Sequence, residues 1–191
     1  MSTRIIGGTA SGRRIKTPGG DATRPTSDRV REALFSSLEA ALGSITGLRF
    51  LDLYAGSGAV GLEACSRGAG VVTCVEQDRR TSALIRDNAR ALGFRVVEVM
   101  TAPVRRILLM SPRAPYDVVF LDPPYHLPDE EVLADLTSLV AQNWLAEAAL
   151  VVAERSRRGA ELSWPTGLVG DREKKYGETL LWYGHAATGA S

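Results

Sequence analysis

The strongest constraint on the fold is an alternation of short apolar runs with longer amphipathic stretches across residues 49–154. The apolar runs are 49–54, 71–76, 95–100, 116–121 and 149–154, and the amphipathic stretches between them are 58–67, 78–92, 103–110 and 129–140. Runs of strand length that are apolar on both faces are typical of buried parallel strands, and stretches of helical periodicity are typical of the helices that cover them. The alternation therefore predicts an α/β fold with a mostly parallel sheet covered on both faces.

The two ends of the chain depart from this alternation. Residues 173–184 read as two strands that meet near Gly177, which predicts an antiparallel C-terminal hairpin at the sheet edge. Residues 3–7 and 12–16 alternate around a turn rich in Gly and Ser, which predicts a short N-terminal β-hairpin.

One main domain with two short appendages is expected. A length of 191 residues, 45% of them hydrophobic and 24% charged, is ordinary for one globular domain. The expected division is a basic hairpin and loop over residues 1–25, the main domain over 26–185, and a flexible tail over 186–191. The main domain should open with a helix near Ser27. Its buried stripe is expected to comprise Val30, Leu34, Leu38 and Ala41.

Several classes of protein are disfavoured by what the sequence lacks. It has no run long enough to span a membrane and no apolar stretch typical of a secretory signal, so a cytoplasmic protein is expected. Cys65 and Cys74 lie in apolar segments without metal-ligand spacing, and His126 and His185 lie far from them in the sequence. We therefore expect neither a metal site nor a disulfide framework.

Positive charge is concentrated near the N-terminus. Residues 1–35 hold seven basic side chains and three acidic ones, so their net charge of +4 leaves −3 for the rest of a chain whose total is +1. A basic arm on a nearly neutral body is suited to contacts with phosphates, although a solubilising tail explains the charge equally well.

A glycine-rich loop follows the apolar run 49–54. Gly56, Gly58 and Gly61 form the pattern G-x-G-x-x-G between a predicted strand and a predicted helix, where the backbone must turn tightly and approach a ligand. Glu76 ends the next strand, twenty positions after Gly56, where a carboxylate can accept hydrogen bonds from a ribose diol. This pattern suits NAD as well as S-adenosylmethionine. Asp52 favours the latter, because an anion there suits an ammonium group and repels a pyrophosphate.

A second motif, Asp122-Pro123-Pro124-Tyr125, follows the run 116–121. Two prolines fix the backbone and remove its donors, so the turn presents a carboxylate, carbonyl oxygens and an aromatic face. Asp122 and the Pro123 carbonyl are placed to accept the two hydrogens of an exocyclic amine while Tyr125 stacks on the base. Such an amine is conjugated with its ring, and acceptors that draw its N–H groups out of plane restore the nucleophilic lone pair. The motif therefore predicts methyl transfer to a base amine.

With both motifs in place, the sequence resembles the RsmD family of bacterial 16S ribosomal RNA guanine-N2 methyltransferases. The resemblance is carried by RIIGG, GRRI, TRPTSDRVREALF, DLYAGSGAVGLEACSRGA, LDPPY and YGETLLWY, which cover nearly the whole chain. It implies a Rossmann-like class I methyltransferase fold with a seven-stranded sheet, S-adenosylmethionine as donor and a guanine of the small ribosomal subunit, or of its assembly intermediate, as acceptor. Because many relatives have an Asp after the third strand where this chain reads Met100 to Pro103, either Thr101 or a backbone group is expected to substitute for it.

The complete set of expected site residues follows from the motifs and the resemblance. The catalytic set is Asp122, Pro123, Pro124 and Tyr125; the cofactor set is Asp52, Tyr54, Gly56, Ser57, Gly58, Glu76, Gln77 and Thr101; and the RNA-binding set is Arg4, Arg13, Arg14, Arg24, Thr26 and Arg29. Glu32 is implied to stand near the mouth of the site.

Three other functions remain open. D-P-P-Y also suits DNA adenine-N6 methylation, although no separate target-recognition domain is evident. A non-catalytic RNA-binding module would keep the nucleotide pocket without needing the intact tetrapeptide. An NAD oxidoreductase accounts for neither the tetrapeptide nor the basic arm.

Packing is the expected role of Trp144, Trp164 and Trp182. His126 is expected at the rim of the site, and the protein is expected to be a monomer.

Overall fold

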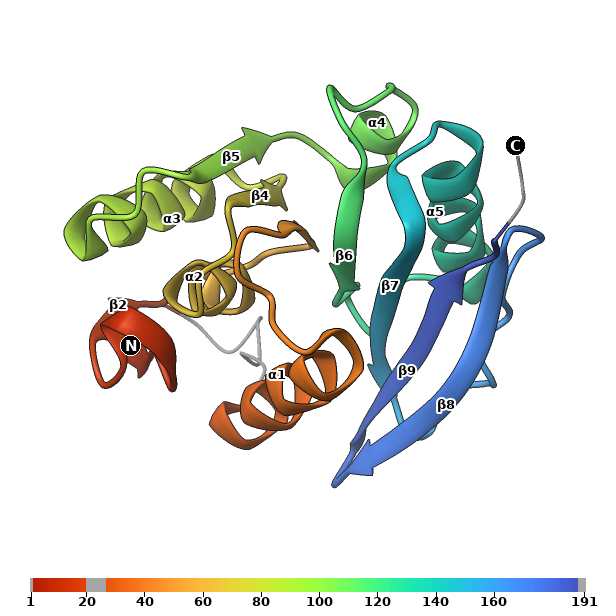
Figure 1. Ribbon diagram of the computed structural model, residues 1–191, viewed down its shortest axis with the longest axis horizontal. Helices are drawn as coiled ribbons and strands as arrows, with labels where there is room; N and C mark the ends of the chain where they lie inside the picture. The colour runs from red at the N-terminus through yellow and green to blue at the C-terminus, as the bar shows by residue number, and fades with distance from the viewer. Residues whose placement is uncertain (1, 20–26, 189–191) are drawn as a thin grey trace.

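A computed structural model describes residues 2–19 and 27–188 and contains a seven-stranded sheet with a separate two-stranded hairpin (Figure 1). The strands are β1 (Ser2–Arg4), β2 (Arg14–Lys16), β3 (Arg49–Leu53), β4 (Val71–Glu76), β5 (Val97–Thr101), β6 (Tyr116–Leu121), β7 (Leu145–Ser156), β8 (Leu168–Tyr176) and β9 (Thr179–Ala186). The helices are η1 (Gly8–Ala10, 3₁₀), α1 (Asp28–Leu42), α2 (Ala59–Ser66), α3 (Arg79–Leu92), α4 (Val104–Leu108) and α5 (Asp129–Ala141).

The strand order β5-β4-β3-β6-β7-β9-β8 confirms the predicted sheet. The first five strands in this order pair in parallel, and β9 pairs antiparallel with both β7 and β8. The chain moves outward from β3 through β4 to β5, then returns to the other side of β3 with β6. A switch point of this kind places the loops after β3 and β6 side by side, which is where open α/β sheets bind ligands.

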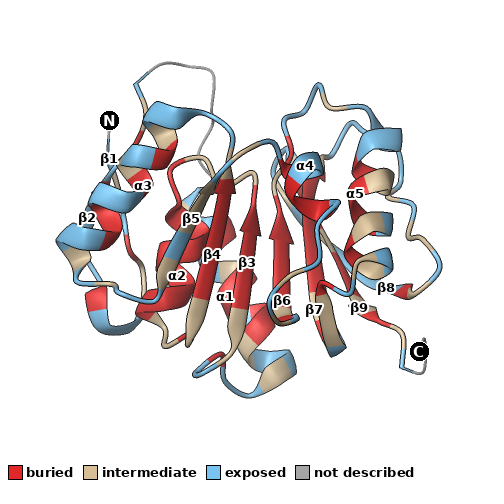
Figure 2. Ribbon diagram, turned by 90° about the horizontal axis from the view of Figure 1, so that it is seen from above, coloured by how far each residue is buried: buried red, intermediate tan, exposed pale blue. Residues whose placement is uncertain are grey.

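Helices cover both faces of the sheet, as the alternation predicted (Figure 2). Side chains of α1, α2 and α3 pack on one face in a core cluster that includes Phe35, Phe50 and Ile85. Side chains of α4 and α5 pack on the other face, with Leu108 and Leu136 among the fully buried residues. Among the described residues, no helix is both long and apolar enough to cross a bilayer.

Helix α1 begins where the sequence predicted. The Ser27 hydroxyl accepts a hydrogen bond from the Val30 amide at 3.3 Å, which satisfies one of the amides left free at a helix start. Val30, Leu34 and Leu38 are buried, but Ala41 is exposed, so the expected stripe is wrong at its last position. Phe35 is fully buried instead, because the buried face rotates around the helix toward the sheet.

The N-terminal hairpin is confirmed, with strands shorter than predicted. It packs against α2 and α3 through Ile5 and Ile15, whose partners include Leu62 and Ala89. The expected boundary between hairpin and main domain stays a prediction, because residues 20–26 lie outside the described part. At the other end Ala186, assigned to the tail, is the last residue of β9.

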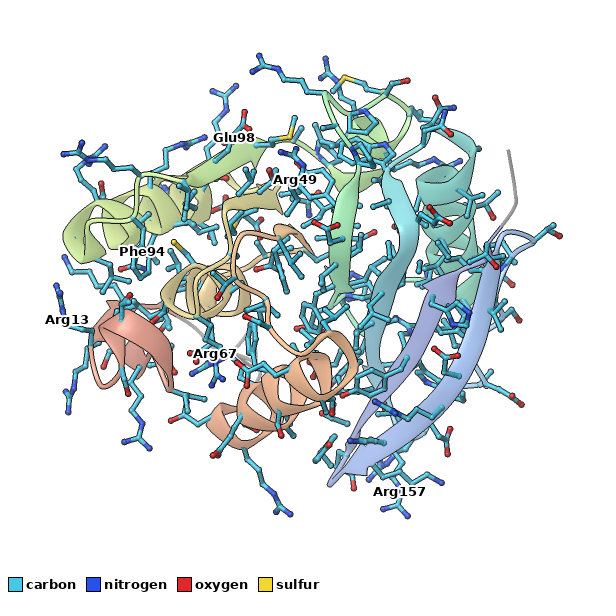
Figure 3. The ribbon with its side chains drawn as sticks, viewed as in Figure 1. Arg13, Arg49, Arg67, Phe94, Glu98 and Arg157 are labelled. Carbon is cyan, nitrogen blue, oxygen red and sulfur yellow. The ribbon has the colours of Figure 1, made fainter. Side chains whose placement is uncertain are left out.

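A buried carboxylate fixes the hairpin to α2. Glu63 is fully buried, and its two oxygens accept hydrogen bonds from the amides of Ile6 and Gly7, both at 2.7 Å. Arg67, one helical turn later, donates to Glu63 at 2.9 Å and to Glu39 of α1 at 3.1 Å. Arg67 lies between α2 and α1 (Figure 3). One ion-pair network thus joins the hairpin and two helices.

The tryptophans pack against the sheet, as expected. Trp144 is buried and donates its indole N–H to the Met110 carbonyl at 2.8 Å. Trp164 lies on Gly170 and Gly184, which face each other across β8 and β9. A Cβ at Gly170 would lie 2.4 Å from the Trp164 indole nitrogen, so these glycines make room for the ring.

We predict that Glu63→Gln lowers the free energy of unfolding by about 2–3 kcal/mol, because the amide nitrogen of Gln would replace one acceptor facing a buried N–H group. Glu39→Gln is the matched control, since it removes only the partly exposed partner of Arg67. Urea denaturation of both variants measures the difference. An equal loss in both would show that the hairpin contacts of Glu63 do not carry this stability.

Candidate functional site

The loops that carry the two motifs meet at the carboxyl edge of the sheet. Leu53 pairs with Val75 of β4 on one side and Leu121 of β6 on the other. Beyond the strands, the Ala55 amide donates to the Val75 carbonyl at 2.9 Å, and the Asp122 amide donates to the Leu53 carbonyl at 3.3 Å. The glycine-rich loop, the end of β4 and the D-P-P-Y turn are therefore held together by the backbone.

The glycines of the loop serve two separate physical needs. Gly56 and Gly58 have φ values of 53° and 74°, in the left-handed region that side chains rarely adopt. Gly61 lies within α2, where a Cβ would stand 2.6 Å from the Cys74 sulfur of the underlying sheet. The first two glycines therefore shape the loop, and the third allows α2 to lie close to β4.

Glu76 spans the loop from the end of β4. One carboxylate oxygen accepts from the Gly56 amide at 2.9 Å and the other from the Asp78 amide at 2.8 Å. A carboxylate has about four acceptor positions, so two backbone donors leave capacity for ligand hydroxyls. The predicted proximity of Glu76 to the glycine-rich loop is confirmed; its contact with a ribose stays a prediction.

Asp52 is placed differently from what the sequence suggested. Its side chain is buried beneath the loop and accepts a hydrogen bond from the Gly61 amide at 2.9 Å. Burial raises the pKa of its carboxyl to about 7; the Gly61 hydrogen bond opposes the rise and the Glu76 charge adds to it. This geometry gives Asp52 a role in holding α2 against β3, and the expected contact with a ligand ammonium stays a prediction.

Tyr54 connects the glycine-rich loop to α5, which covers the sheet face opposite α2. Its φ of 60° is unusual for a residue other than glycine, and its hydroxyl donates to the Asp135 carboxylate of α5. Burial is the main cause that raises the pKa of Tyr54, followed by the hydrogen bond to Asp135. Burial likewise raises the pKa of Asp135, while the Tyr54 hydrogen bond opposes that rise. The phenol is therefore a protonated anchor of the loop.

The D-P-P-Y turn presents the groups that the sequence predicted at the sheet edge. Asp122 is half-buried, Pro123 is buried, and Pro124 and Tyr125 are exposed. The Leu127 amide donates to the Pro124 carbonyl at 2.8 Å, which closes a turn around Tyr125. The Tyr125 side chain is 52% exposed, so its ring is available to an incoming planar group.

The remaining cofactor candidates differ in their surroundings. Ser57 is buried within the loop, and Gln77 is exposed directly after Glu76. Thr101 pairs in register with Glu76 across β5 and β4. Its hydroxyl accepts a hydrogen bond from the Arg86 guanidinium of α3 at 2.8 Å. Thr101, which was expected to replace the Asp of many relatives, therefore already has a hydrogen-bond partner within the protein.

The predicted RNA-binding arginines that the structure describes differ in their surroundings. Arg4 is paired with Asp28 at 3.0 Å, and Arg13 donates to the Ala91 carbonyl at 2.8 Å. Arg14 and Arg29 are exposed, and Arg24 and Thr26 lie outside the described residues. Arg31, counted in the basic charge, is fully buried and bonded to Asp28, Thr3 and the Arg4 carbonyl.

A hollow of about 640 Å³ lies away from the motifs, on the outer strands. Trp164, Trp182 and Arg157 line it together with residues of β8. Arg157 lies beside the ends of β8 and β9 (Figure 3). None of the residues that line this hollow belongs to either motif.

Sequence reasoning missed two residues that support the site. Asp135 holds Tyr54, and Arg155 of β7 contacts the segment that follows the D-P-P-Y turn. A carboxylate among the buried positions of a helix and a basic residue at the end of a buried strand are the only local signals. Neither signal identifies a partner.

We predict that the stability of the wild type falls with rising pH more than that of Asp52→Asn. The pKa of the Asp52 carboxyl is about 7 in the folded protein and 3.8 ordinarily. Its contribution to the free energy of unfolding is therefore fully present below about pH 4 and is lost as pH rises through about 7. Between about pH 5 and pH 7 the wild type should lose about 2 kcal/mol relative to the variant. Urea denaturation at several pH values tests this, and parallel pH profiles would contradict it.

Known proteins are similar to this chain over most of its length. The family model described as Conserved hypothetical protein 95 matches residues 3–185. The Ribosomal RNA small subunit methyltransferase D of Escherichia coli strain K12 is 36% identical over 176 residues, which cover 92% of this chain and 85% of that protein. The protein of that name from Haemophilus influenzae is 36% identical over 157 residues, covering 81% and 79% respectively.

Solved structures with the same fold also carry methyltransferase names. A protein from Escherichia coli that carries a methyltransferase name is 34% identical with a TM-score of 0.83, covering 97% of this chain and 98% of that one. A more distant methyltransferase complexed with SAH, 17% identical with a TM-score of 0.68, covers 91% of this chain and 53% of that one and shows the shared fold. With its glycine-rich loop and D-P-P-Y turn joined at the switch point of a class I methyltransferase sheet, the chain belongs to the RsmD family.

Proposed function

We propose that this protein transfers a methyl group from S-adenosylmethionine to the exocyclic N2 amine of a guanine in 16S ribosomal RNA. The observation that carries the proposal is the junction of the two motifs, where the Asp122 amide donates to the Leu53 carbonyl at the start of the glycine-rich loop. The junction brings the glycine-rich loop and the D-P-P-Y turn to one sheet edge, as transfer between a bound donor and a base amine requires. The names of the relatives support small-subunit ribosomal RNA as the substrate.

The residues of the loop fit S-adenosylmethionine. Glu76 has acceptor capacity for a ribose diol beyond its two backbone donors, and a Cβ at Gly56 would meet no atom nearer than 4.0 Å, which leaves room for a ligand near the backbone. We propose that Tyr54, Gly56, Ser57, Gly58, Gln77 and Thr101 complete the contact surface, with Asp52 beneath it. The donor supplies an electrophilic methyl group on a sulfonium. The distant relative that binds SAH supports this choice over NAD.

The turn supplies the remaining chemistry from its own groups. Asp122 and the Pro123 carbonyl accept the amine hydrogens, and Tyr125 stacks on the base, so the lone pair of the amine is directed toward the methyl group. The pKa of an amine falls sharply as it becomes methylated, and its proton then leaves to solvent without a strong base. His126 is exposed next to the turn and needs no catalytic role.

Adenine-N6 methylation of DNA is the second candidate, because the turn suits any exocyclic amine. We propose ribosomal RNA in a small subunit or its assembly intermediate as the partner, and the cytoplasm as the compartment where a monomer acts. The experiment that separates the candidates offers naked ribosomal RNA, small subunits and duplex DNA in parallel. Nucleoside mass spectrometry then identifies N2-methylguanosine or N6-methyladenosine.

We predict that variants in the two motifs affect different quantities, the rate of methyl transfer in one case and the affinity for the donor in the other. Asp122→Ala should lower kcat by about 10²–10³, by analogy with loss of an oxyanion-hole donor, while leaving donor affinity within a few-fold of wild type. Glu76→Ala should weaken donor binding by about 2–3 kcal/mol, because it loses a charge-assisted pair of hydrogen bonds. Tritiated-methyl transfer and calorimetry measure the two quantities.

Each variant is the control for the other. Wild-type turnover by Asp122→Ala would eliminate the proposed mechanism. Unchanged calorimetric affinity in Glu76→Ala would remove Glu76 from the donor site. N6-methyladenosine as the product would favour the second candidate.

We further propose that the hairpin contacts RNA phosphates through its exposed side. Arg14 is exposed and lies with Arg4 around a small hollow at the end of the hairpin. Because Ile5 and Ile15 are part of the core, a charge substitution tests this contact better than removal of the hairpin.

We predict that Arg14→Gln raises the KM for the ribosomal substrate and reduces the salt slope of binding by about one unit, since one phosphate contact is lost. Arg95→Gln, an exposed change between α3 and β5, serves as the control. If both variants keep the salt slope of the wild type, the hairpin does not bind phosphate through Arg14.

A further inference from the structure

Arg155 is a buried cation at the end of β7, level with the D-P-P-Y turn. The last register pair between β6 and β7 joins Leu121 to Ala153, and Arg155 is two residues farther along the same face. Ala153 packs in the cluster that α5 covers, so Arg155 faces α5 as well. The residue is 8% exposed.

One nitrogen of Arg155 binds both sides of the junction between the turn and α5. Its Nη2 donates to the Leu127 carbonyl at 3.1 Å and to the Asp129 carboxylate at 2.7 Å. Leu127 in turn donates its amide to the Pro124 carbonyl at 2.8 Å. A continuous chain of hydrogen bonds therefore runs from β7 through Leu127 to the turn that presents Tyr125.

The same guanidinium lies close to the anchor of the glycine-rich loop. Its positive charge opposes the rise in the pKa of the Tyr54 phenol, whose main cause is burial. Tyr54 is bonded to Asp135 of α5, and Arg155 is bonded to Asp129 of the same helix. Helix α5 is thus the common support of both motif loops.

Stability alone does not account for this arginine. Its Nη1 is buried without a hydrogen-bond partner, and buried polar groups are rarely left so. Its ion-pair partner Asp129 has a side chain that is 54% exposed, and ion pairs with a solvent-exposed partner contribute little to stability. A cation that retains an unsatisfied donor beside a substrate-binding turn is therefore better explained by a requirement of the turn.

We propose that Arg155 is a positioning residue for methyl transfer: its guanidinium holds the turn over residues 122–127 in the shape that receives the acceptor base. This inference rests on the proposed function.

The experiment compares Arg155→Met and Arg155→Lys with Arg158→Met. Arg158 lies just beyond β7 and forms an ion pair with Glu178 at the surface, so its loss controls for removal of a nearby charge. The measurements are kcat and KM on small subunits, donor affinity by calorimetry, and hydrogen exchange of the Leu127 amide.

Arg155→Met should lower kcat by roughly 10–100-fold, because misplacement of a reacting group by about 1 Å has effects of this size. Donor affinity should stay within about twofold, and the Leu127 amide should exchange faster while the amides of β3 and β6 keep their wild-type rates. Arg155→Lys should recover part of kcat, since an ammonium reaches one of the two acceptors. Arg158→Met should match the wild type.

Wild-type kcat and wild-type exchange at Leu127 in Arg155→Met would overturn the proposal. Faster exchange throughout the sheet would also overturn it, because that result shows a general structural role. If Arg155→Met does not fold, Asp129→Asn tests the same contact, with a smaller loss of kcat expected and an unchanged kcat contradicting the proposal. If the wild type methylates no ribosomal substrate, the proposed function fails, while the exchange measurement still decides whether Arg155 holds the turn.

Discussion

The parallel pairing of β3 with β6 is the interaction on which the site depends. The two strands are adjacent in the sheet although β4 and β5 lie between them in the sequence. Their register ends with Leu53 opposite Leu121, and the next amide, that of Asp122, donates to the Leu53 carbonyl. Without this pairing each motif would be an ordinary surface loop. With it, one loop suited to a nucleoside faces one turn suited to an amine.

Buried ionisable side chains then fix the segments around this junction. Glu63 holds the hairpin, Asp52 holds the start of α2, and Arg155 holds the end of the D-P-P-Y turn, each by bonding to backbone groups outside its own strand or helix turn. Such groups lose their hydration, so they are tolerated only where hydrogen bonds compensate. Their benefit is directional, because a charged group bonded to the backbone restricts where a loop can lie.

The fold could be predicted from the sequence because its signals are local. Apolar runs and helical periodicity can each be recognised within a short stretch of sequence. Both motifs follow predicted strands that the structure contains. The partners of buried polar groups could not be predicted, since the contacts of Tyr54 and Arg155 join residues 81 and 28 positions apart. Charge counting failed for a related reason: Arg31 contributes to the basic N-terminal segment but is buried in the core.

The D-P-P-Y turn combines exposure with rigidity, and this combination limits what it can recognise. Its prolines restrict the backbone before any ligand arrives, and the closed turn at Leu127 holds Tyr125 in solvent. A preformed carboxylate, carbonyl and aromatic face are complementary to an amine on any planar base. In the proposed function, the turn therefore supplies reactivity toward an exocyclic amine without distinguishing guanine from adenine. That choice must come from groups that contact the edge of the base beyond the turn, together with the RNA structure that presents it.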